Sequence, residues 1–305
     1  MPQTAPVENV SKQQNLSQLP VNADPKKVSR ELGLEIASLC GRHFLKINHL
    51  HYGYWPEDLE VDITNLHIAQ DRYTDFLIEH IPPETKTILD VGCGSGQNAK
   101  KITEAGCDID CVSPSPNLAN NARDLLGPGH EIYVSYYETL QTDKRYDLIL
   151  FSESFQYMKI EAAIKKSWDL LNDGGCMLIC DAFKKDVKEK CPLSGGHYLK
   201  SFNEIISRQP FELLKDVDIT EQTAPNIDLE NKMLMEVGAP AWGLFNQLMD
   251  SRYPLMAKLL RWKYRKKIAK VQRKYFSGQK SGENFRKFKS YRLFIYKKTD
   301  AAAGV

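Results

Sequence analysis

Three glycines alternate with other residues in Asp90-Val91-Gly92-Cys93-Gly94-Ser95-Gly96, a segment that lies between a predicted strand and a predicted helix. Glycine lets a backbone approach a ligand closely, and a helix N-terminus presents free N–H groups at its positive dipole end. We favour a ligand site over a ligand-free turn, because a strand-to-helix turn needs fewer glycines. A dinucleotide fingerprint requires a glycine at position 97, where Gln97 stands, so a nicotinamide cofactor is disfavoured.

Two residues could accept a proton beside such a ligand. Glu153 follows a strongly apolar segment, and His197 follows the glycine pair Gly195-Gly196. Either side chain could act as a general base if an acceptor molecule must lose a proton. The alternatives are a loop or helix-capping carboxylate for Glu153 and a packed or surface imidazole for His197.

The elements that must position these residues alternate between strand and helix. Helices are predicted at 98–105, 116–126 and 161–171, and a further helix at 63–81 ends before Pro82-Pro83. This alternation predicts an α/β fold, doubly wound, with a mostly parallel seven-stranded sheet. The seven predicted strands are 87–91, 108–113, 132–134, 146–151, 176–180, 211–219 and 291–296.

Several segments carry a family resemblance. Residues 87–96 resemble the first motif of the class I S-adenosylmethionine-dependent methyltransferases, and four further segments agree in order and spacing. His51-Tyr52-Gly53-Tyr54-Trp55 is similar to a segment of small-molecule members, including sterol and tocopherol methyltransferases and relatives of cyclopropane fatty-acid synthases. The other three segments are 112–116, 137–140 with 146–149, and 170–175. The resemblance is specific for fold and cofactor and weak for substrate.

The resemblance implies roles for individual residues. Gly92 and Gly94 would line the methionine part of the cofactor, with Asp90 fixing the loop. Many relatives carry an acid on the ribose hydroxyls where this sequence has Ser113; the serine is similar to the sterol and cyclopropane-synthase branch, which implies a ribose contact by Ser113. Aromatic rings would close over the sulfonium, an attraction of about 0.5–2 kcal/mol, unless they only pack within the lid. The residues implied in cofactor contact are Tyr52, Tyr54, Trp55, Asp90, Gly92, Gly94, Gln97, Ser113, Pro114, Tyr137, Glu138 and Ser152.

The resemblance and the change of pattern along the chain also predict its organisation. We expect a cofactor-binding methyltransferase core at 84–219 and a final core strand at 288–298. A mainly helical lid would come from the N-terminal segment and a late insertion. The other predicted parts are a disordered tail at 1–27, the N-terminal helical lid at 28–83, the helical basic lid insertion at 220–287 and a tail at 299–305.

Composition excludes several classes of protein. Hydrophobic residues make up 42% of the 305 residues, which excludes a wholly disordered chain. The sequence has neither a run of 18 apolar residues nor an apolar signal core. The seven cysteines form no CxxC pair, and histidines and cysteines lack metal-ligand spacing. We therefore expect a cytoplasmic protein with reduced thiols and no metal.

The formal net charge of +2 hides a basic stretch. Residues 258–298 hold sixteen Lys or Arg and one acid, Glu283. We favour a solvated lid helix whose apolar stripe packs on the protein. Peripheral membrane contact and attraction of an anionic substrate, both through residues 255–280, are left open. A nucleic-acid partner is not expected, because no known binding module is present. The oligomeric state is left open.

Together these observations predict an S-adenosylmethionine-dependent methyltransferase that releases S-adenosylhomocysteine. The acceptor would be a small, partly apolar molecule, methylated at oxygen, nitrogen or carbon by in-line displacement with help from a base. The alternative is a catalytically silent protein of the same fold that docks on a membrane or a partner through its basic helix.

Overall fold

The computed structural model describes residue 41 and residues 47–300. The predicted tail at 1–27 lies outside the described residues. So do residues 28–40 and 42–46 of the predicted N-terminal lid and residues 301–305 of the second predicted tail.

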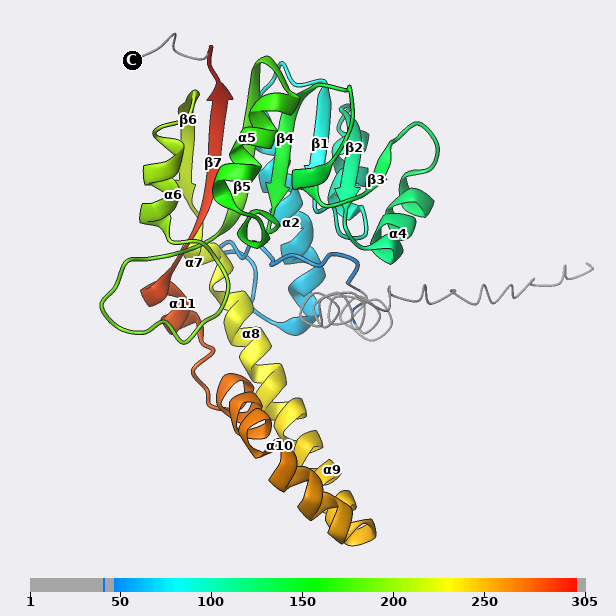
Figure 1. Cartoon of the computed structure of the whole chain (residues 1–305), viewed down its shortest axis with the longest axis vertical. Helices are drawn as coiled ribbons and strands as arrows, with labels where there is room; N and C mark the ends of the chain where they lie inside the picture. Colours follow the sequence, from blue (N-terminus) through cyan, green and yellow to red (C-terminus); the bar gives the residue numbers. More distant parts are fainter. Residues whose placement is uncertain (1–40, 42–46, 301–305) are drawn as a thin grey trace, which may run out of the picture.

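A seven-stranded sheet forms the centre of the molecule (Figure 1). The strand order is β3-β2-β1-β4-β5-β7-β6, and β7 runs antiparallel to both β5 and β6. The predicted doubly wound, mostly parallel α/β sheet is therefore confirmed. The strands are β1 (Thr87–Val91), β2 (Asp108–Ser113), β3 (Ile132–Val134), β4 (Tyr146–Ser152), β5 (Leu171–Lys184), β6 (Phe211–Asp218) and β7 (Lys289–Lys298).

The helices that connect these strands begin where local chemistry allows. Pro116 occupies the first turn of α4, and the Ser115 hydroxyl accepts a hydrogen bond from the Leu118 N–H at 3.3 Å. The segment predicted as one helix at 63–81 is instead a 3-10 turn, Ile63–Asn65, followed by α2. Helix α2 (Leu66–Glu79) precedes β1, and the connecting helices are α3 (Gln97–Glu104), α4 (Pro116–Leu126), α5 (Ile160–Leu170) and α6 (Leu199–Ile206).

Strand β5 begins earlier than the sequence predicts. The glycines at 174 and 175 suggest a turn before a strand at 176, but β5 already pairs with β4 at Leu171, opposite Tyr146. An irregularity in the pairing between Tyr146 and Leu148 accommodates the extra residues. Glycines inside a strand often mark such irregular positions.

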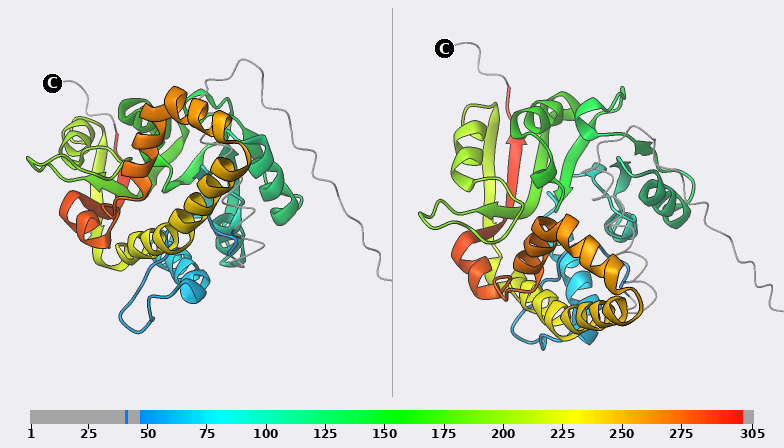
Figure 2. Two further views of the ribbon diagram at one scale, coloured as in Figure 1. Left: turned by 90° about the horizontal axis from the view of Figure 1, so that it is seen from below. Right: turned by 60° about the horizontal axis from the view of Figure 1, so that its bottom comes forward.

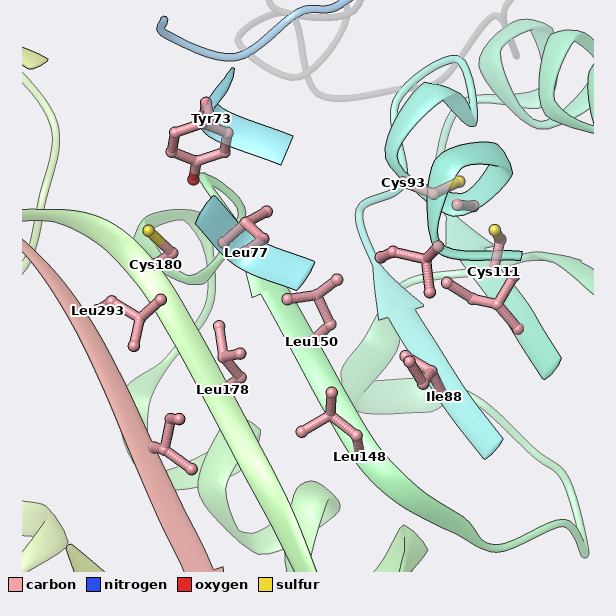
Figure 3. Close-up of a cluster of buried hydrophobic side chains, with 14 of the residues drawn as sticks. Tyr73, Leu77, Ile88, Cys93, Cys111, Leu148, Leu150, Leu178, Cys180 and Leu293 are labelled. Carbon is pink, nitrogen blue, oxygen red and sulfur yellow. The ribbon is translucent and has the colours of Figure 1, made fainter. Parts of the chain in front are cut away.

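Apolar side chains cover both faces of the sheet. On one face Tyr73 and Leu77 of α2 pack over Leu150 of β4 and Leu178 of β5 (Figure 3). The residues of β4 that alternate with these, Ile149 and Phe151, belong to the cluster on the opposite face. Both faces are buried, which explains why β4 is a continuous apolar run rather than an alternating one.

Between β6 and β7 the chain leaves the sheet through a series of helices. Helices α9 and α10 lie side by side and project from the edge at which the parallel strands end (Figures 1 and 2). None of the helices in residues 47–300 is both long and apolar enough to cross a bilayer. The predicted domain limits stay predictions. These helices are α7 (Thr220–Thr223), α8 (Pro225–Met233), a π-helical turn (Leu234–Gly238), α9 (Ala239–Arg252), α10 (Pro254–Tyr275) and α11 (Gly282–Phe288).

Candidate active site

The glycine segment after β1 adopts a left-handed backbone at all three glycines. Their φ angles are +81° at Gly92, +56° at Gly94 and +85° at Gly96. A Cβ at Gly92 would stand 2.6 Å from the Ser154 Cβ, and a Cβ at Gly96 would stand 3.0 Å from backbone of α4. Around Gly94 the nearest atom to such a Cβ is a Leu50 methyl group at 3.6 Å. Packing therefore requires glycine at 92 and 96, whereas Gly94 leaves space open.

That space belongs to a cavity of about 290 Å³ at the ends of β1, β2 and β4. Strand order reverses at β1 and β4, and this is where α/β sheets bind ligands. Ten residues predicted from the sequence line the cavity: Asp90, Gly92, Gly94, Gln97, Ser113, Pro114, Tyr137, Glu138, Ser152 and Glu153.

Asp90 is buried in the wall of the cavity without a full set of hydrogen-bond partners. Its Oδ2 atom has none among the described residues, and neither has the hydroxyl of Ser154. Burial raises the pKa of Asp90 from 3.8 to about 7. A buried carboxylate without partners favours a cationic or hydrogen-bond-donating ligand. The cavity therefore fits a ligand that carries positive charge and amine or hydroxyl donors.

The Asp90 pKa predicts a pH-dependent effect of Asp90→Asn. The unfolded carboxyl ionises near its ordinary pKa of 3.8 and the folded one near 7. The free energy of unfolding therefore falls as pH rises through this window and stays lowered above it. We expect Asp90→Asn to raise the free energy of unfolding by ~1–3 kcal/mol at about pH 8 and by less at about pH 5. Urea titrations at the two pH values measure this difference.

Asp147→Asn is the matched control. The Asp147 carboxylate accepts hydrogen bonds from Lys86, Thr87 and Asn172, and these bonds lower its pKa. The control should therefore destabilise the fold at about pH 8. If Asp90→Asn destabilises it as well, burial does not dominate the Asp90 pKa.

Glu153 follows β4 with a φ angle of +54°, a conformation that costs a non-glycine residue energy. Its Oε1 accepts hydrogen bonds from the Tyr52 N–H at 2.8 Å and the Tyr291 hydroxyl at 2.7 Å. Burial raises the Glu153 pKa to about 7, although both hydrogen bonds lower it. The side chain is thus fixed at the cavity with a pKa suited to a general base near neutral pH.

A tyrosine pair holds this arrangement together. The hydroxyls of Tyr291, from β7, and Tyr73, from α2, lie 3.0 Å apart. The Tyr73 hydroxyl also lies 3.2 Å from the Ser152 Oγ at the end of β4. Burial raises the pKa of both tyrosines well above 10. Both phenols therefore stay protonated and keep their hydrogen bonds near neutral pH.

The three aromatic residues of the 51–55 segment do not line the cavity. The Tyr54 ring stacks on Phe76 with centroids 5.1 Å apart. The Trp55 indole is buried and donates to the Asn226 Oδ1 at 3.1 Å, and the Tyr52 ring packs beside α11 and β7. The backbone N–H of Tyr52, rather than its ring, reaches the site through Glu153.

His197 also lies outside the cavity lining. Its Nε2 stands 3.2 Å from the carbonyl oxygen of Phe155, and its ring lies edge-on to the Phe155 ring. This contact places His197 behind the loop that follows Glu153. Its role as a base stays a prediction.

Two histidines that were not predicted as site residues do line the cavity. The Nε2 of His51 lies 2.9 Å from the His49 Nδ1 and 3.0 Å from the Asn98 Oδ1. Burial lowers the pKa of His51 to about 3 and that of His49 to about 4, so both rings are neutral at pH 7. The His-Leu-His pattern before Tyr52 could have indicated these two residues. It lies in a loop, however, whereas the rule used here places ligands at the carboxyl ends of strands.

Metal binding has no candidate in the part of the chain that the structure describes. Residues 41 and 47–300 contain no group of three or more His, Cys, Asp or Glu side chains placed to hold an ion. The expectation that the reaction needs no metal stays a prediction.

Known proteins with similar sequences are methyltransferases. The profile of a family described as a methyltransferase domain matches residues 66–217. A malonyl-[acyl-carrier protein] O-methyltransferase of Ilyobacter polytropus is 28% identical over 108 residues, covering 34% of this chain and 42% of that protein. An O-methyltransferase of Pyrenophora dematioidea is 23% identical over 239 residues, covering 70% of this chain and 88% of that protein.

A similar solved structure is geranyl diphosphate C-methyltransferase of Streptomyces coelicolor, in complex with S-adenosylhomocysteine. It matches with a TM-score of 0.64 and 17% identity over 92% of this chain and 100% of that one, which shows a shared fold. The strand order and the cavity lined by Gly92 and Gly94 are consistent with the family match. The chain belongs to the methyltransferase-domain family that matches residues 66–217.

Proposed function

We propose that this protein transfers a methyl group from S-adenosylmethionine to a small, partly apolar acceptor, with Glu153 as the base. The observation that carries the proposal is that one cavity holds the open Gly94 position, Glu153 and the Asp90 carboxyl, whose Oδ2 has no partner among the described residues. Support for the acceptor class comes from relatives whose names state malonyl-acyl carrier protein and geranyl diphosphate as substrates.

Each cavity residue takes a part in this proposal. The backbone at Gly92 and Gly94 admits the amino-acid end of the cofactor, and Asp90 attracts its positive charge. Ser113 and Pro114, at the end of β2, face the ribose, while Tyr137 and Glu138 serve the adenine. Ser152 and Gln97 complete the lining. Tyr52, Tyr54 and Trp55 act indirectly, by packing that fixes the loop beside Glu153.

When bound, the cofactor supplies a methyl group on a sulfonium, whose departure leaves a neutral thioether. The protein contributes orientation, which supplies much of the acceleration in such a displacement. Glu153 takes the proton that the acceptor loses, and Tyr291 and the Tyr52 N–H hold its carboxylate in place. His197 supports the Phe155 loop behind it.

The finer statements on partners and location belong to the same proposal. We infer a cytoplasmic enzyme that contacts a membrane peripherally through residues 255–280, a stretch that includes most of helix α10. An anionic substrate attracted by that stretch is the competing interpretation. A catalytically silent docking protein is not favoured, because named relatives are methyltransferases.

The test is a transfer assay with methyl-labelled S-adenosylmethionine. Purified protein is incubated with a malonyl thioester, a phenol or geranyl diphosphate, and S-adenosylhomocysteine release is measured. Binding of S-adenosylhomocysteine in calorimetry together with label in one acceptor supports the proposal. Cofactor binding without label in any of a broad acceptor series supports the silent alternative.

A further inference from the structure

Helices α9 and α10 form an arm that projects from the sheet (Figure 1). The far end of this arm exposes apolar side chains. Leu255, Leu259 and Trp262 are 85%, 59% and 69% exposed, and their spacing puts them on one side of α10. We call these three residues the arm tip. The sequence favours an apolar stripe packed on the protein, and this prediction is wrong for the arm tip. Among the apolar residues of α10, Ala257 is buried.

Cations surround the arm tip. Helix α10 contains nine Lys or Arg residues and no acid. Its helical geometry places Lys258 and Lys263 on the two flanks of the arm tip, with Lys266 one turn further along the same side. Residues 234–275 together hold ten Lys or Arg against two acids, and one of these acids, Asp250, pairs with Arg261 at 2.6 Å.

We propose that the arm tip inserts into the interface of an anionic lipid bilayer, with the flanking lysines and arginines on the headgroups. Leucine and tryptophan on one side of a helix rich in Lys and Arg are typical of helices that lie in a bilayer interface. Long basic side chains bury their aliphatic stems while their charges reach the phosphates. Among the described residues, the arm projects beyond the sheet, so its far end can reach a surface that the rest of the fold does not contact (Figures 1 and 2).

Other occupants fit less well. A second copy would bring two helices of nine cations each against one another, and like charges across an interface repel. A nucleic acid would match the charge but would leave Leu255, Leu259 and Trp262 without an apolar partner. None of the three lines the catalytic cavity, so the proposal does not depend on methyl transfer.

The test is sedimentation of the full chain with phosphatidylcholine vesicles, with and without phosphatidylglycerol. We expect at least ~10-fold stronger binding to the anionic vesicles, weakened by salt because salt screens the lysines and arginines. Trp262 fluorescence should shift to shorter wavelength on binding. The Trp262→Phe variant should bind the vesicles without this shift. It retains three other tryptophans, so its remaining fluorescence should keep its wavelength on binding.

Two variants separate the apolar from the charged contribution. Leu255→Ser with Leu259→Ser and Trp262→Ser should lower anionic-vesicle binding at least ~10-fold, as should Lys263→Glu with Lys266→Glu. The matched control carries serine at three exposed apolar positions elsewhere: Val61, Leu213 and Leu214. It should bind vesicles as the natural chain does. Calorimetry with S-adenosylhomocysteine shows separately that each variant is folded and keeps its cofactor site.

Three results would overturn the proposal. The first is equal binding to neutral and anionic vesicles or none to either, and the second is a control as weak as the tip variant. The third is a different occupant: a dimer in light scattering that the tip variant dissociates without change in vesicle binding, or tighter binding to DNA than to vesicles.

Discussion

Gly94→Asp should lower the affinity for S-adenosylhomocysteine at least ~100-fold in calorimetry, which corresponds to ~3 kcal/mol. The backbone at 94 has a φ of +56°, and the nearest atom to an added Cβ is 3.6 Å away, so a side chain there extends into the cavity rather than into packed protein. An aspartate also adds negative charge near Asp90, which is already buried with one unpartnered oxygen. The added charge alone would attract a cationic ligand, so the expected loss of affinity comes from the ligand space that the side chain fills.

Backbone strain must be separated from loss of ligand space. Gly278→Asp is the matched control, because Gly278 has a φ of +70° and nothing within 4 Å of an added Cβ. Both variants should unfold at similar urea concentrations, but only Gly94→Asp should lose the ligand. Unchanged affinity in Gly94→Asp would remove the cavity as the cofactor site.

Glu153→Gln should lower kcat by ~10²–10⁴ while leaving S-adenosylhomocysteine affinity within about threefold. Glutamine keeps an oxygen that can accept from the Tyr52 N–H and the Tyr291 hydroxyl, so the loop should hold its position. What the variant lacks is a group that takes the acceptor's proton. The measurement is the rate with whichever acceptor in the assay turns over fastest.

The pH profile distinguishes a base from a positioning residue. A base acts when deprotonated, so the natural enzyme should gain activity as pH rises through the Glu153 pKa of about 7. Glu153→Gln should lose this rise. Asp181→Asn is the control, since burial also raises the Asp181 pKa to about 7, but its carboxylate accepts from Gln156 and Ala182 outside the cavity lining. Normal turnover in Glu153→Gln, or a pH rise that only Asp181→Asn removes, would reassign the base.

The buried carboxyls also bear on stability. Burial raises the pKa of Asp90, Glu153 and Asp181 to about 7. Each of them therefore lowers the free energy of unfolding as pH rises from its ordinary pKa toward 7. Such groups are typical of sites that sacrifice stability for function, and a bound cation would relieve the cost at Asp90.

The sequence by itself determined the fold and most of the cavity lining. Strand and helix periods and the glycine spacing are properties of residues close together in the chain, so each can be recognised without knowing the rest. The ten predicted residues that line the cavity lie at strand ends or just after them, where parallel topology brings them to one edge. The sequence did not predict the early start of β5, because this irregular pairing depends on the neighbouring strand β4.

Only the tertiary structure decided what the 51–55 segment contacts and how Glu153 is held. The Tyr52 N–H and the Tyr291 hydroxyl reach Glu153 from 101 and 138 positions away, and Asn226 meets Trp55 across 171 positions. No local period encodes such contacts, because a side chain's direction follows from the surfaces packed against it. The same holds for the arm tip: spacing shows that Leu255, Leu259 and Trp262 share a side of a helix, but only the packed molecule leaves that side exposed.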